Sequence, residues 1–235
     1  KWKALTAVEP GFCPPTMIDH AGAKQLLIWH PESIKALNPA DGSLYWTLPL
    51  KPGYGMSIMA PQKSGNLLFA SGIGRVGAVM KLDAEKPGAE FLWRAKPKEG
   101  LFAANVTPLI IDGTLYGCDI DTSGFTAANL ETGERYWQTT LPTLGEENPE
   151  RGGRHGTAFP TLHEESGNLF PFSEPGHLII DNVSTDFYTE VSRSKILEPT
   201  NEAFGRPVVW AAPAFAMKSA FLRNDQELVR VNLAE

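Results

Sequence analysis

The loop Arg151-Gly152-Gly153-Arg154-His155-Gly156 carries the side chains best suited to binding a ligand. Guanidinium groups pair bidentately with carboxylate or phosphate oxygens, and glycines let the backbone approach a ligand closely. We therefore expect Arg151, Arg154 and His155 to bind an acidic group, more weakly as salt rises. Binding should strengthen below about pH 6.5, where an ordinary histidine becomes charged. The alternative is a solvated loop that binds nothing.

Two short motifs resemble cofactor sites but lack parts that such sites need. Residues 72–77 match the dinucleotide fingerprint G-x-G-x-x-G, but a β-like run follows instead of a helix, so we expect a strand connection. Residues 119–124 copy the first half of an EF-hand calcium loop, but Leu130 stands where a bidentate glutamate is needed. A polar hairpin turn is expected there, with a non-EF calcium site built from Asp119 and Asp121 as the alternative.

Composition favours a β-rich chain and excludes some partners. The 235 residues include 22 glycines and 19 prolines, which favours many turns over long helices. A net charge of −6 argues against nucleic acid and anionic membranes as partners. No apolar run is long enough to span a bilayer, so no membrane insertion is expected. Cys13 and Cys118 are expected to be free, buried thiols, with one disulfide as the alternative.

A repeated segment predicts the fold. Residues 36–46 and 127–137 both read Ala-x-Asn-x-x-(Thr/Asp)-Gly-x-x-x-Trp, which indicates a strand, a tight turn and a second strand ending on tryptophan. A looser copy runs from Leu82 to Trp93. Tryptophans then recur at intervals of 44, 47 and 44 residues, at Trp2, Trp46, Trp93 and Trp137. This period suits four-stranded β-propeller blades of about 40–50 residues, and each of these indoles is expected to dock into the seam with a neighbouring blade.

The whole chain, residues 1–235, is expected to be one all-β propeller domain of about five blades, or a segment of a larger propeller. In the first three blades the expected strands are 14–18, 25–29, 33–37 and 44–48; 56–60, 66–70, 78–82 and 91–94; and 105–110, 114–118, 126–130 and 135–139. In the last two they are 157–162, 169–172, 177–180 and 187–198; and 210–215, 219–223 and 227–232.

In a propeller, the loop at 151–156 would lie at the mouth of the central channel. Equivalent connections bring further candidate ligand-binding residues to that face: Tyr54, Asn105, Trp210, His30, Glu32, Glu174 and His177. Polar, acidic and aromatic groups gathered in this way are typical of a binding site. The alternative is that the opposite charges pair with one another.

The tryptophan spacing resembles the docking motif of PQQ-like (quinoprotein-type) β-propeller repeats. That family includes the quinoprotein alcohol dehydrogenases and the propeller scaffold of bacterial outer-membrane protein assembly. Residues 153–234, with His155-Gly156-Thr157-Ala158-Phe159 and Leu197-Glu198-Pro199-Thr200, also resemble PQQ-like repeat proteins of planctomycete-type bacteria, which are predicted to be exported. The dehydrogenases hold PQQ beside an adjacent-cysteine disulfide and have eight blades. No Cys-Cys pair occurs here and about five blades fit, so no cofactor is expected, PQQ included.

The expected function is a non-catalytic binding or scaffold propeller, periplasmic or extracellular, that takes a protein partner or a small or saccharide ligand at its channel face. The alternative is an exported quinoprotein-like oxidoreductase or a carbohydrate-active enzyme with its site at the channel mouth. An enzyme needs a cofactor, a metal or a matched acid–base pair. None of the five histidines falls in His-x-x-x-His or His-x-His spacing, and no Gly-x-Ser-x-Gly occurs. A scaffold needs only an exposed patch, of about 800 Å² per partner.

Overall fold

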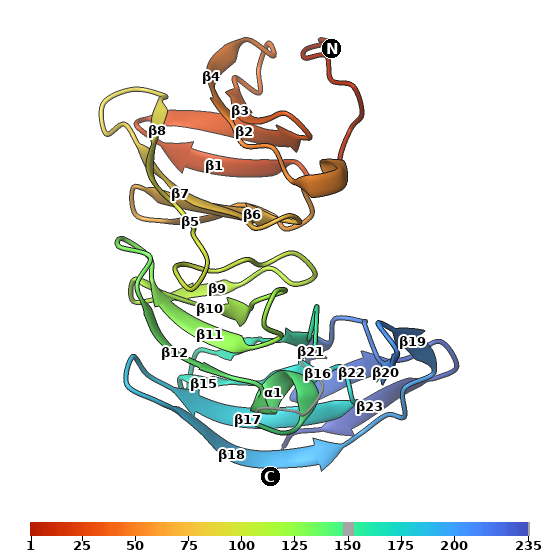
Figure 1. Ribbon diagram of the computed structural model, residues 1–235. Coiled ribbons are helices and arrows are strands. Elements are labelled where there is room, and N and C mark those ends of the chain that lie inside the picture. The colour runs from red at the N-terminus through yellow and green to blue at the C-terminus, as the bar shows by residue number, and fades with distance from the viewer. Residues whose placement is uncertain (148–152, 235) are drawn as a thin grey trace. The chain divides into compact units, whose positions relative to one another are not determined.

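The computed structural model describes residues 1–147 and 153–234, and its regular elements are almost all β-strands (Figure 1). Within these ranges the exceptions are a one-turn helix, α1 (Leu141–Leu144), and a 3-10 turn, η1 (Gly53–Gly55). The prediction of an all-β chain is confirmed. The described residues form no helix with the length and apolar character that a membrane span requires.

Three antiparallel sheets have four strands each, with neighbouring strands following one another along the chain. The first contains β1 (Thr16–His20), β2 (Ala23–His30), β3 (Ser33–Leu37) and β4 (Leu44–Pro49). The second contains β5 (Gln62–Ser64), β6 (Leu67–Gly72), β7 (Val76–Leu82) and β8 (Ala89–Arg94). The third contains β9 (Leu109–Ile111), β10 (Thr114–Cys118), β11 (Phe125–Asn129) and β12 (Arg135–Thr139). This up-and-down order is that of a propeller blade.

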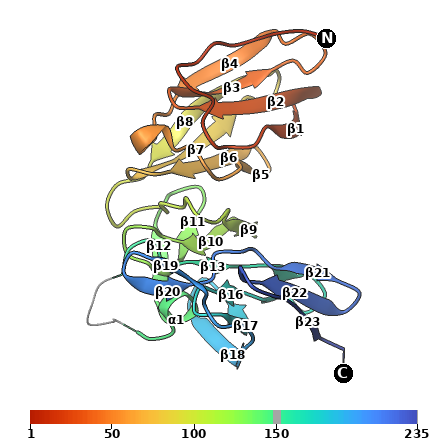
Figure 2. The ribbon, with the colours of Figure 1, turned by 90° about the vertical axis from the view of Figure 1, so that its right-hand side faces the viewer.

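The remaining strands form less regular sheets. One has six strands, including the short strands β13 (Ala158–Phe159), β14 (Leu162–His163), β15 (Asn168–Leu169) and β16 (Phe172–Ser173). Strand β17 (His177–Val183) pairs with β18 (Tyr188–Lys195) on one side and with β15 and β16 on the other, and these two pair in turn with β14 and β13. The chain ends with a hairpin of β19 (Asn201–Ala203) and β20 (Arg206–Val208), visible in blue in Figure 2, and a sheet of β21 (Ala214–Ala216), β22 (Ser219–Arg223) and β23 (Leu228–Asn232).

Prolines explain several differences from the expected strands. Pro160 and Pro171 interrupt the strands expected at 157–162 and 169–172, because proline has no N–H to continue a ladder. The strand expected at 105–110 begins only at Leu109, after Pro108. The strand expected at 56–60 is wrong, since this segment follows the η1 turn and the strand starts beyond Pro61.

The chain divides into two compact units, each with its own core. The first comprises Lys1–Tyr116 and Ala128–Arg135, and the second comprises Gly117–Ala127 and Tyr136–Glu235. Leu27, Trp29, Leu68 and Met80 lie in the core of the first unit, each at most 1% exposed. In the second unit Phe172, Ala220 and Leu222 form the centre of a corresponding cluster.

The repeated motif has local causes. The side-chain oxygen of Asn129 accepts hydrogen bonds from the N–H groups of Glu131 and Thr132, both at 2.8 Å, and so closes the turn. In the earlier copy Asn38 accepts from Ala40 N–H at 3.0 Å. The motif glycines, Gly42 and Gly133, have φ values of 77° and 76°, in the left-handed region that glycine enters without cost.

All six tryptophans donate their indole N–H to an acceptor. Three donate to the turn of another hairpin: Trp2 to Pro39 O (3.0 Å), Trp93 to Leu130 O (3.0 Å) and Trp137 to Ser184 O (2.7 Å). The others donate to groups elsewhere: Trp29 to Leu50 O (2.8 Å), Trp46 to Gln25 Oε1 (2.8 Å) and Trp210 to Glu174 Oε2 (3.0 Å). A Cβ on Gly42 would lie 2.4 Å from the Trp2 ring, so a bulkier residue in this turn would collide with the indole.

Trp46 departs from the pattern of Trp2, Trp93 and Trp137. The turn between β7 and β8 belongs to the looser copy of the motif and is longer than the other turns. The carbonyl oxygen of its Asp83 is hydrogen-bonded to His20 Nε2 at 3.0 Å. Trp46 instead binds the fully buried Gln25 side chain of its own sheet. The energetic role expected of these indoles stays a prediction, and Trp137 is the place to test it.

Candidate functional site

The candidate residues of the first unit pair locally. His30 is 4% exposed, its Nδ1 contacts Glu32 Oε2, and its Nε2 lies 3.3 Å from Ser33 Oγ. A hydrogen bond from Val8 N–H, together with His30, holds the pKa of the Glu32 carboxyl below its usual range. The two side chains therefore engage each other, and whether they also bind a ligand stays a prediction.

Tyr54 and Asn105 also belong to the first unit. Tyr54 is 88% exposed at the η1 turn, where its φ is 56°. Asn105 is half-buried before β9. A shared face for these residues and those of the second unit stays a prediction.

The candidate residues of the second unit meet through an aromatic ring that the sequence did not point to. His155 stacks on Phe204, with ring centroids 4.7 Å apart and planes 2° from parallel. Phe204 in turn contacts Trp210, with centroids 6.2 Å apart at 45°. Phe204 is 59% exposed and Trp210 is 40% exposed. We call His155, Phe204 and Trp210 the aromatic patch. Arg151 lies outside the described residues.

The backbone at this patch is strained. Phe204 has φ 52° and His155 has φ 57°, both in the left-handed region that bulky residues avoid. Phe204 and Gly205 (φ 75°) form the tip of the β19–β20 hairpin, in a position that usually takes asparagine or glycine. Such strain gathers at binding and active sites, so the stacked pair is a candidate for function. The Phe-Gly pair before Arg206 was the available sequence signal, but the hairpin itself was not expected.

Glu174 fixes the groups around the patch. Glu174 is 1% exposed. Its carboxylate accepts hydrogen bonds from Arg206 Nε (2.5 Å) and Nη2 (3.2 Å) and from Trp210 Nε1 (3.0 Å). Thr157 N–H donates to the same carboxylate at 3.0 Å. A buried carboxylate needs such partners to stay charged. Glu174 therefore orients Trp210 and Arg206 and has little capacity left for a ligand.

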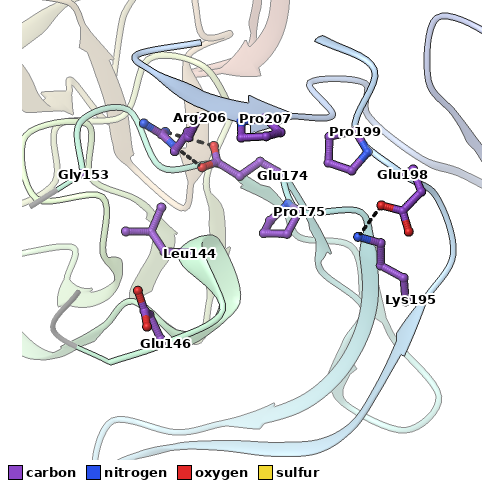
Figure 3. Close-up of a pocket in the computed structure, with 10 residues that line it drawn as sticks. All are labelled: Leu144, Glu146, Gly153, Glu174, Pro175, Lys195, Glu198, Pro199, Arg206 and Pro207. Carbon is purple, nitrogen blue, oxygen red and sulfur yellow. Dashed lines mark hydrogen bonds and ion pairs between the residues drawn. The ribbon is translucent and has the colours of Figure 1, made fainter. Parts of the chain in front are cut away.

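A cavity of about 540 Å³ adjoins this cluster (Figure 3). Leu144 of α1 and the prolines Pro175, Pro199 and Pro207 supply its apolar walls. Its charges are largely paired, since Arg206 points toward Glu174 and Lys195 Nζ lies 3.2 Å from Glu198 Oε2 (Figure 3). A cavity of this size, with apolar walls and paired charges, suits an apolar side chain better than an anion.

The cationic site expected at Arg154 and His155 needs one correction. Burial and the nearby Arg154 and Arg206 lower the pKa of His155, with Asp121 acting in the opposite direction. The strengthening of anion binding is therefore expected to begin below about pH 6.5 by some margin, because His155 becomes charged only at lower pH. Arg154 is exposed and supplies the lasting positive charge.

The two motifs that resemble cofactor sites are turns. Residues 72–77 form the end of β6, the connecting turn at 73–75 and the start of β7, with Ser71 paired with Gly77, so the motif is a strand connection as predicted. Asp119 is fully buried, and its Oδ1 accepts the N–H groups of Asp121 (3.0 Å) and Thr122 (3.2 Å) in the connection from β10 to β11. In the described part of the chain, no three His, Cys, Asp or Glu side chains are grouped so that they could hold a metal ion.

Removing divalent cations is expected to leave the melting temperature unchanged. The Asp119 carboxylate is already engaged by its own turn, and a bound ion would otherwise stabilise the folded state by mass action. Thermal melting with and without a chelator measures this. A fall in melting temperature that calcium alone restores would show a real calcium site.

Both cysteines are free thiols, as expected, but Cys13 is half-buried and not buried as predicted. Cys118 is buried, and its sulfur lies 3.2 Å from Ala158 N. Burial raises the pKa of Cys118 to about 12 and that of Cys13 to about 11. Thiols that stay protonated are poor nucleophiles, so neither is suited to covalent catalysis.

Comparisons with known proteins address the fold and the family. A family profile described as "Outer membrane protein assembly factor BamB" matches residues 30–157, more than half of the chain. The crystal structure of BamB from Moraxella catarrhalis is similar, with a TM-score of 0.60 and 15% identity over 94% of this chain. A protein of unknown function from Bacteroides caccae gives a TM-score of 0.49 and 13% identity, covering 92% of this chain and 77% of its own. The comparison with curated proteins gave no match.

The likeness to the Moraxella structure, at this identity, concerns the fold. It confirms the prediction of an all-β propeller fold. The chain spans 58% of the length of that structure. The number of about five blades and the resemblance to planctomycete-type proteins stay predictions.

Proposed function

Because this chain belongs to the family of the outer membrane protein assembly factor BamB, we propose that it is a non-catalytic scaffold that binds a protein partner in the bacterial cell envelope. The PQQ-like repeat family expected from the tryptophan spacing is confirmed by this membership. The periplasmic or extracellular location and the protein partner are parts of the proposal. No cofactor is part of it, PQQ included.

The aromatic patch carries the proposal. Aromatic residues and arginine are the types that contribute most binding energy at protein interfaces. Phe204 and Trp210 are exposed, Arg206 lies beside them, and Glu174 holds both Trp210 and Arg206 in place. A rigid, exposed aromatic cluster loses little side-chain entropy when a partner binds. The neighbouring cavity with its proline walls offers room for an apolar side chain of the same partner.

The polar groups of the cluster support binding over catalysis. A general acid or base must reach a proton of the substrate. Glu174, the buried carboxylate of the cluster, already accepts hydrogen bonds from Arg206, Trp210 and Thr157. His155 is stacked on Phe204, and its pKa is lowered by burial and by nearby arginines. These arrangements orient an interface, and none of them supplies a matched acid–base pair.

Phe204→Ala is expected to weaken partner binding by about 30-fold, the loss of a strong interface residue. Its ring is 59% exposed, so the free energy of unfolding should change by less than about 1 kcal/mol. The measurement is the amount of folded outer-membrane β-barrel protein, read from heat-dependent gel mobility, in cells that lack the gene and are complemented with each variant.

Phe187→Ala is the matched control, because Phe187 is 52% exposed in the same unit and lies outside the patch. It should complement as wild type does, and Phe204→Ala should not. Full complementation by Phe204→Ala would remove the patch from the function. Unchanged β-barrel protein in cells that lack the gene altogether would overturn a scaffold role in outer-membrane protein assembly, which is the role that the family description suggests.

A further inference from the structure

We propose that a second cavity, beside Trp210, binds a single neutral sugar ring. This inference goes beyond the scaffold role: the two share Trp210, but the polar groups of this cavity lie outside the aromatic patch. The cavity has a volume of about 190 Å³ and lies between the β19–β20 hairpin, the segment after it and the turn that follows β22. Trp210 supplies its aromatic wall, and Thr200, Glu202, Arg223, Asn224 and Asp225 supply polar groups.

The aromatic wall is fixed in orientation. The indole N–H of Trp210 is bound to the buried Glu174 carboxylate at 3.0 Å, while 40% of the residue remains exposed. The C–H groups on one face of a sugar ring carry small positive charges, and the face of an indole is negative. An exposed tryptophan that is already anchored therefore suits a sugar ring, since little freedom is lost when the two stack.

The polar side of the cavity is also held rigidly. Asn224 Nδ2 donates to Glu198 O at 3.0 Å, and its Oδ1 accepts the N–H groups of Gln226 and Glu227, both at 2.8 Å. Asp225 N–H donates to Thr200 Oγ1 at 3.2 Å, and Thr200 Oγ1 lies 3.4 Å from Asp225 Oδ2. The turn after β22 is thus tied to the segment before β19, which sets the positions of Arg223 and Asp225.

Two charged groups of the cavity remain available for a ligand. Arg223 and Glu202 are exposed, and neither forms an ion pair with any residue that the structure describes. Arg223 offers several N–H donors, and the carboxylates of Glu202 and Asp225 offer acceptors. Donors and acceptors side by side match adjacent hydroxyl groups, each of which both donates and accepts.

Charge and volume restrict the ligand further. Two carboxylates face one guanidinium, so a ligand carrying a carboxylate or phosphate would be repelled overall. The volume equals that of about six water molecules in the liquid, which is the scale of one sugar ring. The ligand class that fits is a neutral monosaccharide or the end of a glycan chain.

Isothermal titration calorimetry of the whole chain with glucose, galactose, mannose and N-acetylglucosamine tests the site, with glucuronic acid and glucose 6-phosphate as charged counterparts. At least one neutral sugar should bind, and both charged sugars should bind more weakly than it does. Arg223→Ala should weaken the neutral sugar by about tenfold or more, the usual effect of losing a charged hydrogen-bond donor. Phe187→Ala, at a residue 52% exposed and outside both this cavity and the aromatic patch, should bind the sugar as wild type does.

Three results would overturn the site: heat from none of the neutral sugars, equal affinity for neutral and charged sugars, or unchanged affinity in Arg223→Ala. None of these three results bears on the scaffold role, because Arg223→Ala should still complement in the β-barrel assembly measurement. A failure of Phe204→Ala to show any assembly defect would, in turn, leave the sugar measurement unaffected.

Discussion

Trp137→Ala is expected to lower the free energy of unfolding by about 3 kcal/mol, the lower end of the cost of truncating a large buried aromatic residue. Trp137 is half-buried, and its indole contacts Phe125 and Tyr188, both with ring centroids 6.1 Å away. Its N–H donates to Ser184 O at 2.7 Å. Truncation would leave a cavity beside the fully buried Phe125 and leave that carbonyl oxygen without its donor. Chemical denaturation measures the change.

Two companion variants separate the contributions to this loss. Trp137→Phe keeps most of the ring and removes the donor, so it should cost about 1 kcal/mol. Leu228→Ala, at a residue 70% exposed in the same unit, should change stability by less than about 0.5 kcal/mol. A loss below about 1 kcal/mol for Trp137→Ala would mean that the recurring tryptophan does not stabilise the fold in the way its spacing predicts.

Asp181→Asn is expected to make the free energy of unfolding less sensitive to rising pH. Asp181 of β17 is fully buried, and neither carboxylate oxygen has a hydrogen-bond partner among the described residues. Burial, and then the Glu190 carboxylate opposite it on β18, raise the pKa of Asp181 to about 8, while Tyr188 opposes the shift. The folded protein therefore keeps a proton that the unfolded chain releases near pH 4.

The sign of the effect follows from proton binding. Between about pH 4 and pH 8 the unfolded state holds fewer protons, so this residue makes stability fall by about 1.4 kcal/mol per pH unit. Asparagine does not titrate. The variant should gain on the order of 4 kcal/mol relative to wild type between about pH 5 and pH 8, and the difference should then level off.

Denaturation of both proteins across this pH range measures the difference. The pKa of His177 is lowered chiefly by burial, but His177 is present in both proteins and its contribution cancels. Asp186→Asn, at an exposed residue of the next turn, should show no pH-dependent difference. Parallel pH profiles for wild type and Asp181→Asn would show that Asp181 is ionised in the folded protein.

The parts of the fold that could be predicted from the sequence are those with local causes. The strands expected at 33–37, 114–118 and 135–139 have the observed bounds, because an adjoining turn fixes each of them. The strand expected at 56–60 failed because it was placed by repeating the scheme of the first unit, while the turn before it and Pro61 after it decide where pairing begins.

The candidate site could be predicted only in part, because its contacts join distant residues. Residue types singled out His155 and Trp210, but Phe204, which links them, is an ordinary aromatic residue in the sequence. Nothing local indicates that Glu174 receives Arg206, more than thirty positions away. That pairing decides which charges remain available to a ligand. The sequence alone therefore overstates the number of unpaired charges near the aromatic patch.

Because each of the six indole N–H groups has a different acceptor, these groups can serve as intrinsic spectroscopic reporters. Each indole N–H gives one signal in a two-dimensional NMR spectrum, and each donates to a different group: Pro39 O, Leu50 O, Gln25 Oε1, Leu130 O, Ser184 O and Glu174 Oε2. The rate at which each proton exchanges with solvent therefore reports the local opening of the structure around one of these contacts. Heating or denaturant would show, without any extrinsic probe attached to the chain, which of these contacts open early and which open only with the whole fold.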